Sequence, residues 1–385
     1  MTPGVLASRR PNVPACTCLP MDQTAHNLPV QLTTFIGRVE EMNELSKLLD
    51  DSACRMATLV GPGGSGKTRL VMEAARIMAS EFPDGVYFVP LEPVGSVEFL
   101  VPAIADSIGL SLRGQEEPKA QLLNHLNDNQ LLIVLDNFEH LITAASVLSD
   151  MLAAATKLKL IVTTREALKL SEEWIFPVPG MRFPETNAAA GPENYDSVRL
   201  FVERAQRVKR GYSPEADWAA IVRLCQLTWG MPLAVELAAS WINVLSCQEI
   251  VAEIERNLDF LASSLRNVPE RHRSVRAVFA QSWSLLGQQE RDVFARLSVF
   301  RGTFGREAAE EIAGASLPLL STLVDKSLLK PLPESRYRVH ELLRQYAFEK
   351  LSQSSEDVSR ARDSHSAYYL DFLRRRTPDF IGGRQ

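Results

Sequence analysis

The chain has 385 residues, more than one ordinary domain contains, so two or three domains are expected. Its composition, with 45% hydrophobic and 23% charged residues, is that of soluble globular proteins, and a net charge of -5 argues against general nucleic-acid binding. No apolar stretch reaches the roughly 18–20 residues that span a bilayer, and the N-terminus lacks the apolar segment of a signal peptide. Together with five scattered cysteines, of which Cys16 and Cys18 are interpreted as free thiols, these features favour a cytoplasmic location and no membrane partner.

Residues 1–30 are polar, rich in proline and aperiodic, so a flexible N-terminal segment is expected there. Apolar spacing then predicts a helix over 38–49 and a buried strand over 56–60. Residues 61–68, with the sequence Gly-Pro-Gly-Gly-Ser-Gly-Lys-Thr, follow this strand and match the phosphate-binding loop G-x-x-x-x-G-K-T. A plain glycine-rich turn is the alternative, but the full match between a strand and a helix favours a nucleotide site.

The chemistry of this loop gives each residue type a role. Glycines let the backbone approach an anion, so that successive N–H groups and the helix N-terminus face the phosphates. Lys67 is expected to neutralise the β- and γ-phosphates, and the Thr68 hydroxyl is expected to hold Mg²⁺. The nucleotide-binding residues expected in this segment are Gly61, Gly63, Gly64, Ser65, Gly66, Lys67, Thr68 and Arg69.

Short apolar runs alternate with helical patterns over the rest of the first half. Strands are expected over 86–89, 131–135, 158–162 and 174–178, and helices over 99–108, 119–126 and 141–155. Such alternation is typical of a parallel sheet covered by helices. We therefore expect an α/β P-loop NTPase domain over 31–185.

Two strand ends carry residues suited to the same site. Asp136 follows the apolar run 131–135, where a carboxylate could serve catalysis by holding the Mg²⁺ bound to Thr68. An N-cap at the start of the next helix is the alternative. The next residue is Asn137, which cannot act as a base, so at most a weak ATPase is expected unless Glu139 substitutes; a surface role in the loop is the alternative for Glu139. Arg165 ends the next strand as a second catalytic candidate, able to reach a γ-phosphate, although a salt-bridged surface arginine fits equally. The guanine-reading pattern Asn-Lys-x-Asp is absent, which favours adenine.

The second half is mostly helical. Helices are expected over 198–208, 218–227 and 232–245, which predicts an all-helical domain over 195–266. Further helices over 275–286, 290–299, 307–312, 317–325 and 341–351 surround an expected hairpin of 327–332 and 336–340. This order predicts a winged-helix domain over 267–355. An amphipathic helix over 365–376 is interpreted as the start of a C-terminal helical region over 356–385.

Six segments occur in the order typical of STAND ATPases. They are Phe35–Glu40, the phosphate loop, Leu132–Asn137, Thr163–Arg165, Gly230–Ala234 and Val339–Arg344. Over about residues 31–376 the chain resembles the nucleotide-binding core of bacterial STAND transcriptional regulators, in the branch related to apoptotic and plant-resistance ATPases, the NB-ARC or AP-ATPase group. The ordered set is more specific than any one of its members.

The resemblance implies ATP or ADP with Mg²⁺ as the ligand. It implies that Ile36, Gly37 and Arg38 lie against the adenine and that Pro232 packs on the base. It further implies that Arg165 senses phosphate and that His340, from the winged-helix domain, contacts the β-phosphate of ADP; a partly exposed or core-satisfied wing histidine is the alternative. Glu341 replaces the usual aspartate after that histidine, and the usual sensor repeats are missing, which suggests either a truncated form or a sensor or effector module beyond Gln385.

Three functions remain open at this point. The first is a signal-transduction switch in which ADP holds the domains closed, and ATP opens them and promotes self-association. The second is a transcriptional regulator that reads DNA through its own winged helix, but the expected recognition helix over 317–326 is mainly apolar, which argues against direct DNA binding. The third is a turnover NTPase or kinase, which Asn137 disfavours.

Overall fold

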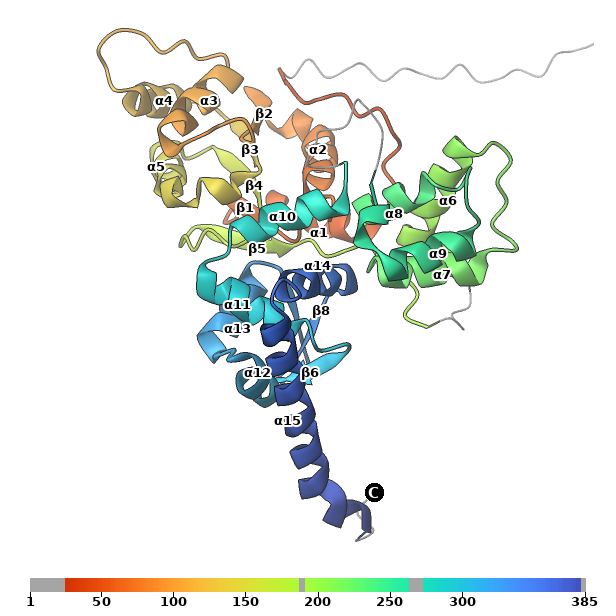
Figure 1. The fold of residues 1–385 in the computed structure, drawn as a ribbon. Helices are drawn as coiled ribbons and strands as arrows, with labels where there is room; N and C mark the ends of the chain where they lie inside the picture. The colour runs from red at the N-terminus through yellow and green to blue at the C-terminus, as the bar shows by residue number, and fades with distance from the viewer. Residues whose placement is uncertain (1–24, 187–190, 263–272, 382–385) are drawn as a thin grey trace, which may run out of the picture.

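Figure 1 shows the computed structural model, which describes residues 25–186, 191–262 and 273–381. The expected flexible segment 1–30 lies outside these residues except for 25–30, and Cys16 and Cys18 lie outside them as well. Within the described residues, no helix is both long enough and apolar enough to cross a bilayer.

The first half forms a five-stranded sheet in which every pairing is parallel, as the alternating pattern predicts. The strand order is β2-β3-β4-β1-β5. The strands are β1 (Met56–Val60), β2 (Gly85–Pro90), β3 (Leu131–Asp136), β4 (Lys159–Thr164) and β5 (Glu173–Pro177). The helices are α1 (Val39–Asp50), α2 (Lys67–Ile77), α3 (Leu100–Ser107), α4 (Pro118–Leu126) and α5 (Ser146–Ala154). The expected helix over 141–155 is wrong at its start, where a 3₁₀ turn over Ile142–Ala144 precedes α5.

Helices cover both faces of this sheet because its strands are apolar on both sides. Ile133 and Leu135 of β3 pack in a core with α3, α4 and α5. Leu132 and Val134, which point to the opposite face, pack in a second core with α1 and α2. The result is a three-layer α/β unit whose strand ends meet at one edge, where the phosphate loop leaves β1.

Helices α6 (Asp196–Val208), α7 (Trp218–Leu227), α8 (Pro232–Ala239) and α9 (Cys247–Arg256) form the following region. The first two agree with the sequence prediction, whereas the helix expected over 232–245 ends at Ala239. Helix α9 was not predicted. It begins with a capping box in which the Ser246 hydroxyl accepts from the Glu249 N–H and the Glu249 carboxylate accepts from the Ser246 N–H.

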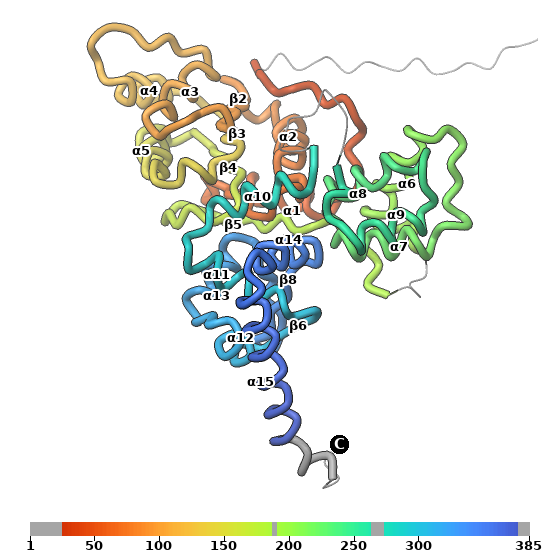
Figure 2. Tube along the Cα trace, in the orientation of Figure 1, coloured from red at the N-terminus to blue at the C-terminus, as the bar shows by residue number. Residues whose placement is uncertain are grey.

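The C-terminal region combines helices with a small antiparallel sheet of order β6-β8-β7. Its elements are α10 (Val275–Ser284), α11 (Gln288–Leu297), β6 (Thr303–Gly305), α12 (Arg306–Ala313), α13 (Leu317–Asp325), β7 (Leu329–Leu332), β8 (Arg336–Val339), α14 (Glu341–Leu351) and α15 (Ser355–Ile381). The expected hairpin is confirmed as β7 and β8, and β6 was missed. Helix α15 is longer than the expected 365–376, and it projects away from the rest of the chain in Figure 2.

One buried apolar cluster joins the two helical regions. It contains Phe201 of α6 and Leu224 of α7 together with Phe279 of α10, Phe294 of α11 and Leu342 of α14. A continuous core of this kind holds α6–α9 and α10–α14 in one arrangement.

Two glycines allow the chain after β5 to cross the turn between α7 and α8. A Cβ on Gly180 would lie 2.0 Å from Trp229 O, and a Cβ on Gly230 would lie 2.0 Å from Met181 O. Gly230 also has a φ of +60, and its carbonyl accepts from the Met181 N–H at 2.8 Å. Only glycine fits at such a crossing, so the two backbones lie in direct contact.

Candidate functional site

The phosphate-binding loop of residues 61–66 leaves the carboxyl end of β1 and turns directly into α2. Gly64 and Gly66 adopt φ values of 80 and 89, in the left-handed region that glycine tolerates. A Cβ on Gly61 would lie 2.3 Å from Val178 O, and one on Gly63 would lie 2.3 Å from Val278 Cγ1. Because α2 begins at Lys67, the unpaired N–H groups of its first turn and its dipole favour an anion at this loop.

A cavity of about 220 Å³ lies over this loop. Its lining includes Gly63, Gly64, Gly66, Lys67, Thr68, Arg69, Asn137, Glu139, Thr163, Arg165, Pro232, Leu233, Glu236, Val278 and Gln281. The loop therefore forms only one wall of the cavity. Helices α8 and α10 supply another, and no sequence motif indicated the part taken by α10.

Lys67 lies at the cavity with its ammonium group held by the loop itself. The Nζ donates to Gly61 O at 2.7 Å and to Pro62 O at 3.1 Å. Three rotatable N–H donors on a flexible stem suit this group to follow a phosphate oxygen. Lys67 therefore lies at the wall of the cavity, and its contact with phosphates stays a prediction.

Thr68 and Asp136 lie side by side across the sheet edge. The Asp136 Oδ1 accepts from Thr68 Oγ1 at 2.7 Å and from Thr163 Oγ1 at 2.6 Å, and Thr163 Oγ1 accepts from the Asn137 N–H at 2.9 Å. This proximity follows from the strand order, since β4 lies between β1 and β3.

These oxygens fit Mg²⁺. Magnesium is commonly held by one or two carboxylates together with substrate phosphates and water, so it does not need a cage made only of protein ligands. The residues that the structure describes contain no cluster of three or more His, Cys, Asp or Glu side chains suited to a metal. Thr68 and Asp136 would hold the ion beside the phosphates, where it would neutralise their charge.

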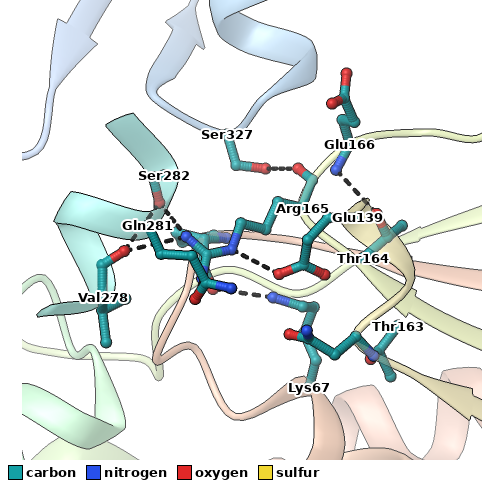
Figure 3. A network of polar contacts seen from close by, with 12 residues as sticks. Lys67, Glu139, Thr163, Thr164, Arg165, Glu166, Val278, Gln281, Ser282 and Ser327 are labelled. Carbon is teal, nitrogen blue, oxygen red and sulfur yellow. Dashed lines mark hydrogen bonds and ion pairs between the residues drawn. The ribbon is translucent and has the colours of Figure 1, made fainter. Parts of the chain in front are cut away.

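Arg165 is buried, with 6% of its surface exposed, and its guanidinium is held from two sides (Figure 3). Its Nε donates to Glu139 Oε1 at 2.8 Å, so both the surface alternative for Arg165 and a surface position for Glu139 are wrong. Its Nη1 donates to Val278 O at 3.1 Å and to Ser282 Oγ, and its Nη2 donates to Gln281 Oε1. Arg165 therefore links the NTPase sheet to α10 at the edge of the cavity.

Arg38 is almost completely buried, and its contacts are structural. Its Nη2 donates to Ser65 O and to Pro179 O, each at 2.7 Å, and its N–H donates to Asp196 Oδ2 at 3.2 Å. Burial lowers the pKa of the Arg38 guanidinium, and the neighbouring Glu41 opposes this shift. Gly37 approaches the same carboxylate, since a Cβ on it would lie 2.4 Å from Asp196 Cγ.

A second cavity, of about 30 Å³, lies where the resemblance expects adenine. Ile36, Arg38, Gly66, Arg69 and Pro232 are among its lining residues, and Gly37 is not. A water molecule needs a cavity of about 10–15 Å³, so this cavity has room for two or three waters, and a purine ring requires its walls to move. Pro232 lines both cavities, which brings it between the two.

Arg69 points its guanidinium at the segment before α1. Its Nη2 donates to Thr33 O at 2.5 Å and to Thr34 O at 2.7 Å, and burial lowers the pKa of the group. Arg69 lines both cavities as well, so it would lie near a nucleotide bound there. These two hydrogen bonds, however, direct its guanidinium to the segment before α1 and not to the phosphate loop.

His340 is not among the residues that line either cavity, and its expected contact with the β-phosphate of ADP stays a prediction. Its Nδ1 accepts from the Leu342 N–H at 3.1 Å, its Nε2 lies 3.0 Å from Thr228 O, and its ring lies 4.9 Å from that of Trp229. Both ring nitrogens are thus engaged by backbone groups. Burial lowers the pKa of His340 to about 4, so the ring is neutral and links the end of α7 to the start of α14.

Comparison with known proteins agrees with an NTPase core. A family model described as an AAA domain matches residues 47–170. The Walker-type ATPase PABY2304 of Pyrococcus abyssi has a similar fold, with a TM-score of 0.57 and 12% identity over 81% of this chain and 96% of that one. At that identity the likeness shows the fold alone.

Two mycobacterial relatives are more similar in sequence. A protein of Mycobacterium tuberculosis named "Putative HTH-type transcriptional regulator Rv0890c" is 34% identical over 327 residues, which are 82% of this chain but only 36% of the regulator. The protein Rv0894 of Mycobacterium tuberculosis is 32% identical over 344 residues, which are 86% of this chain and 84% of Rv0894. Because this identity extends over most of both proteins, the chain belongs to the same family as Rv0894, with a P-loop NTPase core of the AAA type.

Proposed function

We propose that this chain is an ATP- and ADP-binding signal-transduction switch, whose nucleotide state controls how its regions are held together. The observation that carries the proposal is the composition of the phosphate-loop cavity. Lys67 and Thr68 come from the loop, Pro232 comes from α8, and Val278 and Gln281 come from α10. A ligand in this cavity therefore touches three parts of the chain and can favour one arrangement of them over another.

The proposal includes the assignment to the NB-ARC or AP-ATPase group of STAND ATPases. It divides the chain into an NTPase domain (31–185), a helical domain (195–266), a winged-helix domain (267–355) and the start of a further helical region (356–385). The order α11, β6, α12, α13, β7, β8 with the sheet order β6-β8-β7 supports the winged-helix assignment. Self-association in the ATP state and a sensor or effector module outside this chain belong to the same proposal.

Slow ATP hydrolysis is part of this function. Asn137 occupies the position after Asp136 and cannot take a proton from water. Glu139, the alternative base, is occupied by its ion pair with Arg165 at 2.8 Å. A switch benefits from slow turnover, since each state then persists, and the same features disfavour a turnover NTPase or kinase.

The nucleotide that co-purifies with the protein, identified after denaturation, tests the proposal first. We then expect Lys67→Ala to weaken ATP and ADP binding by roughly tenfold to hundredfold, because charge-assisted hydrogen bonds to the phosphates are lost. Asp136→Asn keeps the shape of the side chain and should remove the gain in affinity that Mg²⁺ gives over EDTA. The exposed Lys47 on α1 provides the matched control Lys47→Ala. Unchanged affinity in both site variants would contradict the site.

A second candidate is a transcriptional regulator that binds DNA through its own winged helix, as the name of the relative Rv0890c suggests. Helix α13 itself contains no lysine or arginine, and Lys326 after it is paired with Glu290 at 2.8 Å. The hairpin does expose Lys330 and Arg336. Fluorescence anisotropy with duplex DNA at low salt, in ADP and in ATP, separates the two candidates. A salt-sensitive dissociation constant below about 1 µM, which is tighter than typical non-specific binding, would favour the regulator.

A further inference from the structure

We propose that Gln281 on α10 makes this site distinguish a nucleoside triphosphate from a diphosphate, by competing with the γ-phosphate for the Arg165 guanidinium. The inference rests on the proposed nucleotide switch. It adds the residue through which the third phosphate is read, and it assigns to α10 the part that moves.

Helix α10 lies directly over the phosphate-binding loop. Val278 and Gln281 line the cavity together with Lys67 and Thr68. The packing is so close that a Cβ on Gly63 would lie 2.3 Å from Val278 Cγ1. An anion that fills this cavity therefore meets α10 as well as the loop.

Arg165 is the cation that α10 shares with the cavity (Figure 3). On one side, Glu139 Oε1 accepts from Arg165 Nε at 2.8 Å and fixes the guanidinium at the cavity wall. On the other side, α10 engages both terminal nitrogens, since Gln281 Oε1 accepts from Nη2 at 2.5 Å, and Val278 O and Ser282 Oγ accept from Nη1. A phosphate oxygen that approaches Nη2 from the cavity therefore meets Gln281 as a competing acceptor on the same nitrogen.

The charge of the acceptors decides this competition. The three α10 acceptors are an amide, a hydroxyl and a backbone carbonyl, and all are neutral. A hydrogen bond from arginine to an anionic oxygen is roughly twice as strong as one to a neutral acceptor, so a γ-phosphate displaces Gln281. A diphosphate is shorter by one phosphoryl group and leaves the Arg165–Gln281 bond in place.

Displacement of Gln281 has an effect beyond the cavity, because α10 belongs to the core that joins the two helical regions. Phe279, the residue after Val278 on α10, packs in that core, and its ring centroid lies 6.2 Å from that of Tyr346 on α14. Ser327 Oγ also donates to Arg165 O at 3.0 Å, so the same arginine holds the segment after α13. Loss of the Gln281 bond therefore weakens one of the three contacts by which Arg165 holds α10, and with it the attachment of the C-terminal region to the NTPase sheet.

Two substitutions at Gln281 test the proposal in opposite directions. Gln281→Ala removes the competitor, and we expect ATP affinity to rise about threefold relative to ADP. Gln281→Glu gives Arg165 a charged partner and places a carboxylate beside the γ-phosphate, so ATP affinity should fall roughly tenfold relative to ADP. Gln289→Glu, at an exposed position on α11 outside the cavity, is the matched control for the charge change and should leave the ratio unchanged.

Amide hydrogen exchange tests the same proposal independently. If Gln281 had only a structural role, the exchange rate of α10 would not depend on which nucleotide is bound. Residues 275–284 should exchange faster with a non-hydrolysable ATP analogue than with ADP, and Gln281→Glu should suppress this difference. An unchanged ATP-to-ADP affinity ratio in both Gln281 variants, or equal exchange of α10 in the two nucleotides, overturns the role of Gln281 and leaves the proposed switch intact. Wild-type protein that binds neither nucleotide overturns the proposed function itself.

Discussion

Arg38 shows how a single buried side chain can hold several parts of a site in register. Its guanidinium donates to the carbonyl of Ser65 in the phosphate loop and to the carbonyl of Pro179 after β5, and its backbone N–H donates to the Asp196 carboxylate at the start of α6. The resemblance assigns Arg38 to the adenine, and the structure adds that its guanidinium fixes the backbone on which the phosphates would rest. Such a buried cation is stabilising only while its partners remain in place.

We predict that Arg38→Ala lowers the free energy of unfolding by about 3–5 kcal/mol, because the buried guanidinium that donates to Ser65 O, Pro179 O and Glu41 Oε1 is removed. Nucleotide affinity should fall in the same variant, since the carbonyl of Ser65 is released. Chemical denaturation and nucleotide titration measure the two effects. Arg76→Ala removes an arginine with 65% exposure that pairs with Glu73 on α2, and it should cost less than about 1 kcal/mol. Equal losses in the two variants would contradict the structural role of Arg38.

At the scale of elements, the strands of the NTPase sheet are predictable because their signal is local. The run Leu131–Asp136 is buried along its whole length, so a short apolar run followed by a carboxylate is enough to identify it. Helix α9 was missed although Ser246 and Glu249 form a capping box, a signal that the sequence does carry. Strand β6 has only three residues, Thr303–Gly305, too few for any alternation to show.

The candidate site divides in the same way. Lys67, Thr68 and Asp136 are predictable because the loop and the strand end are recognised by spacing within the chain. The α10 wall is not, since Val278 and Gln281 reach the cavity through packing between regions more than 200 residues apart from the loop in sequence. The role of His340 stays a prediction, because the resemblance gives it a phosphate ligand while this arrangement gives both of its nitrogens to backbone groups.

The junction between α7 and α14 should be sensitive to acid. The pKa of His340 is lowered by burial from 6.5 to about 4, so between these values the unfolded chain binds a proton that the folded chain does not. Stability is therefore complete above about pH 6.5, falls as the pH drops towards 4 and levels off below it, with a maximum loss of about 3 kcal/mol. Urea denaturation between pH 7 and pH 4 measures this slope.

His340→Gln should abolish that contribution, because glutamine does not titrate in this range. The exposed His125 on α4 provides the control, since His125→Gln should retain the wild-type slope. A wild-type slope that persists in His340→Gln would assign the acid sensitivity to other groups.

At the scale of the whole molecule, the contacts that close the chain are of two kinds. The helical regions share an extensive buried core, whereas the C-terminal region meets the NTPase sheet through polar contacts. These include the bond from Ser327 Oγ to Arg165 O at 3.0 Å and the exposed pair of Lys169 with Asp325 at 3.6 Å. Exposed pairs contribute about 0–1 kcal/mol, so the pair of Lys169 with Asp325 adds little, and the bonds from buried Arg165 to α10 carry the polar side of this closure.

We predict that a non-hydrolysable ATP analogue increases the radius of gyration measured by small-angle X-ray scattering, relative to ADP. A shift from mostly closed to mostly open requires about 5.5 kcal/mol of differential affinity, which a few charge-assisted bonds at the phosphates can supply. Static light scattering of the same samples reports self-association. Lys67→Ala should give one scattering curve in both nucleotides, and identical curves for the wild-type protein would contradict the switch.

The contact between Gly180 and Gly230 sets the mechanics of any such opening. No side chain separates the two backbones, so no side-chain rearrangement can change their spacing. The hydrogen bond from the Met181 N–H to Gly230 O, at 2.8 Å, joins them directly. We therefore expect the segment after β5 and the turn between α7 and α8 to move together. The NTPase unit and α6–α9 should then turn as one unit, so an opening that moves α10–α14 must also repack the core that those helices share with α6–α9.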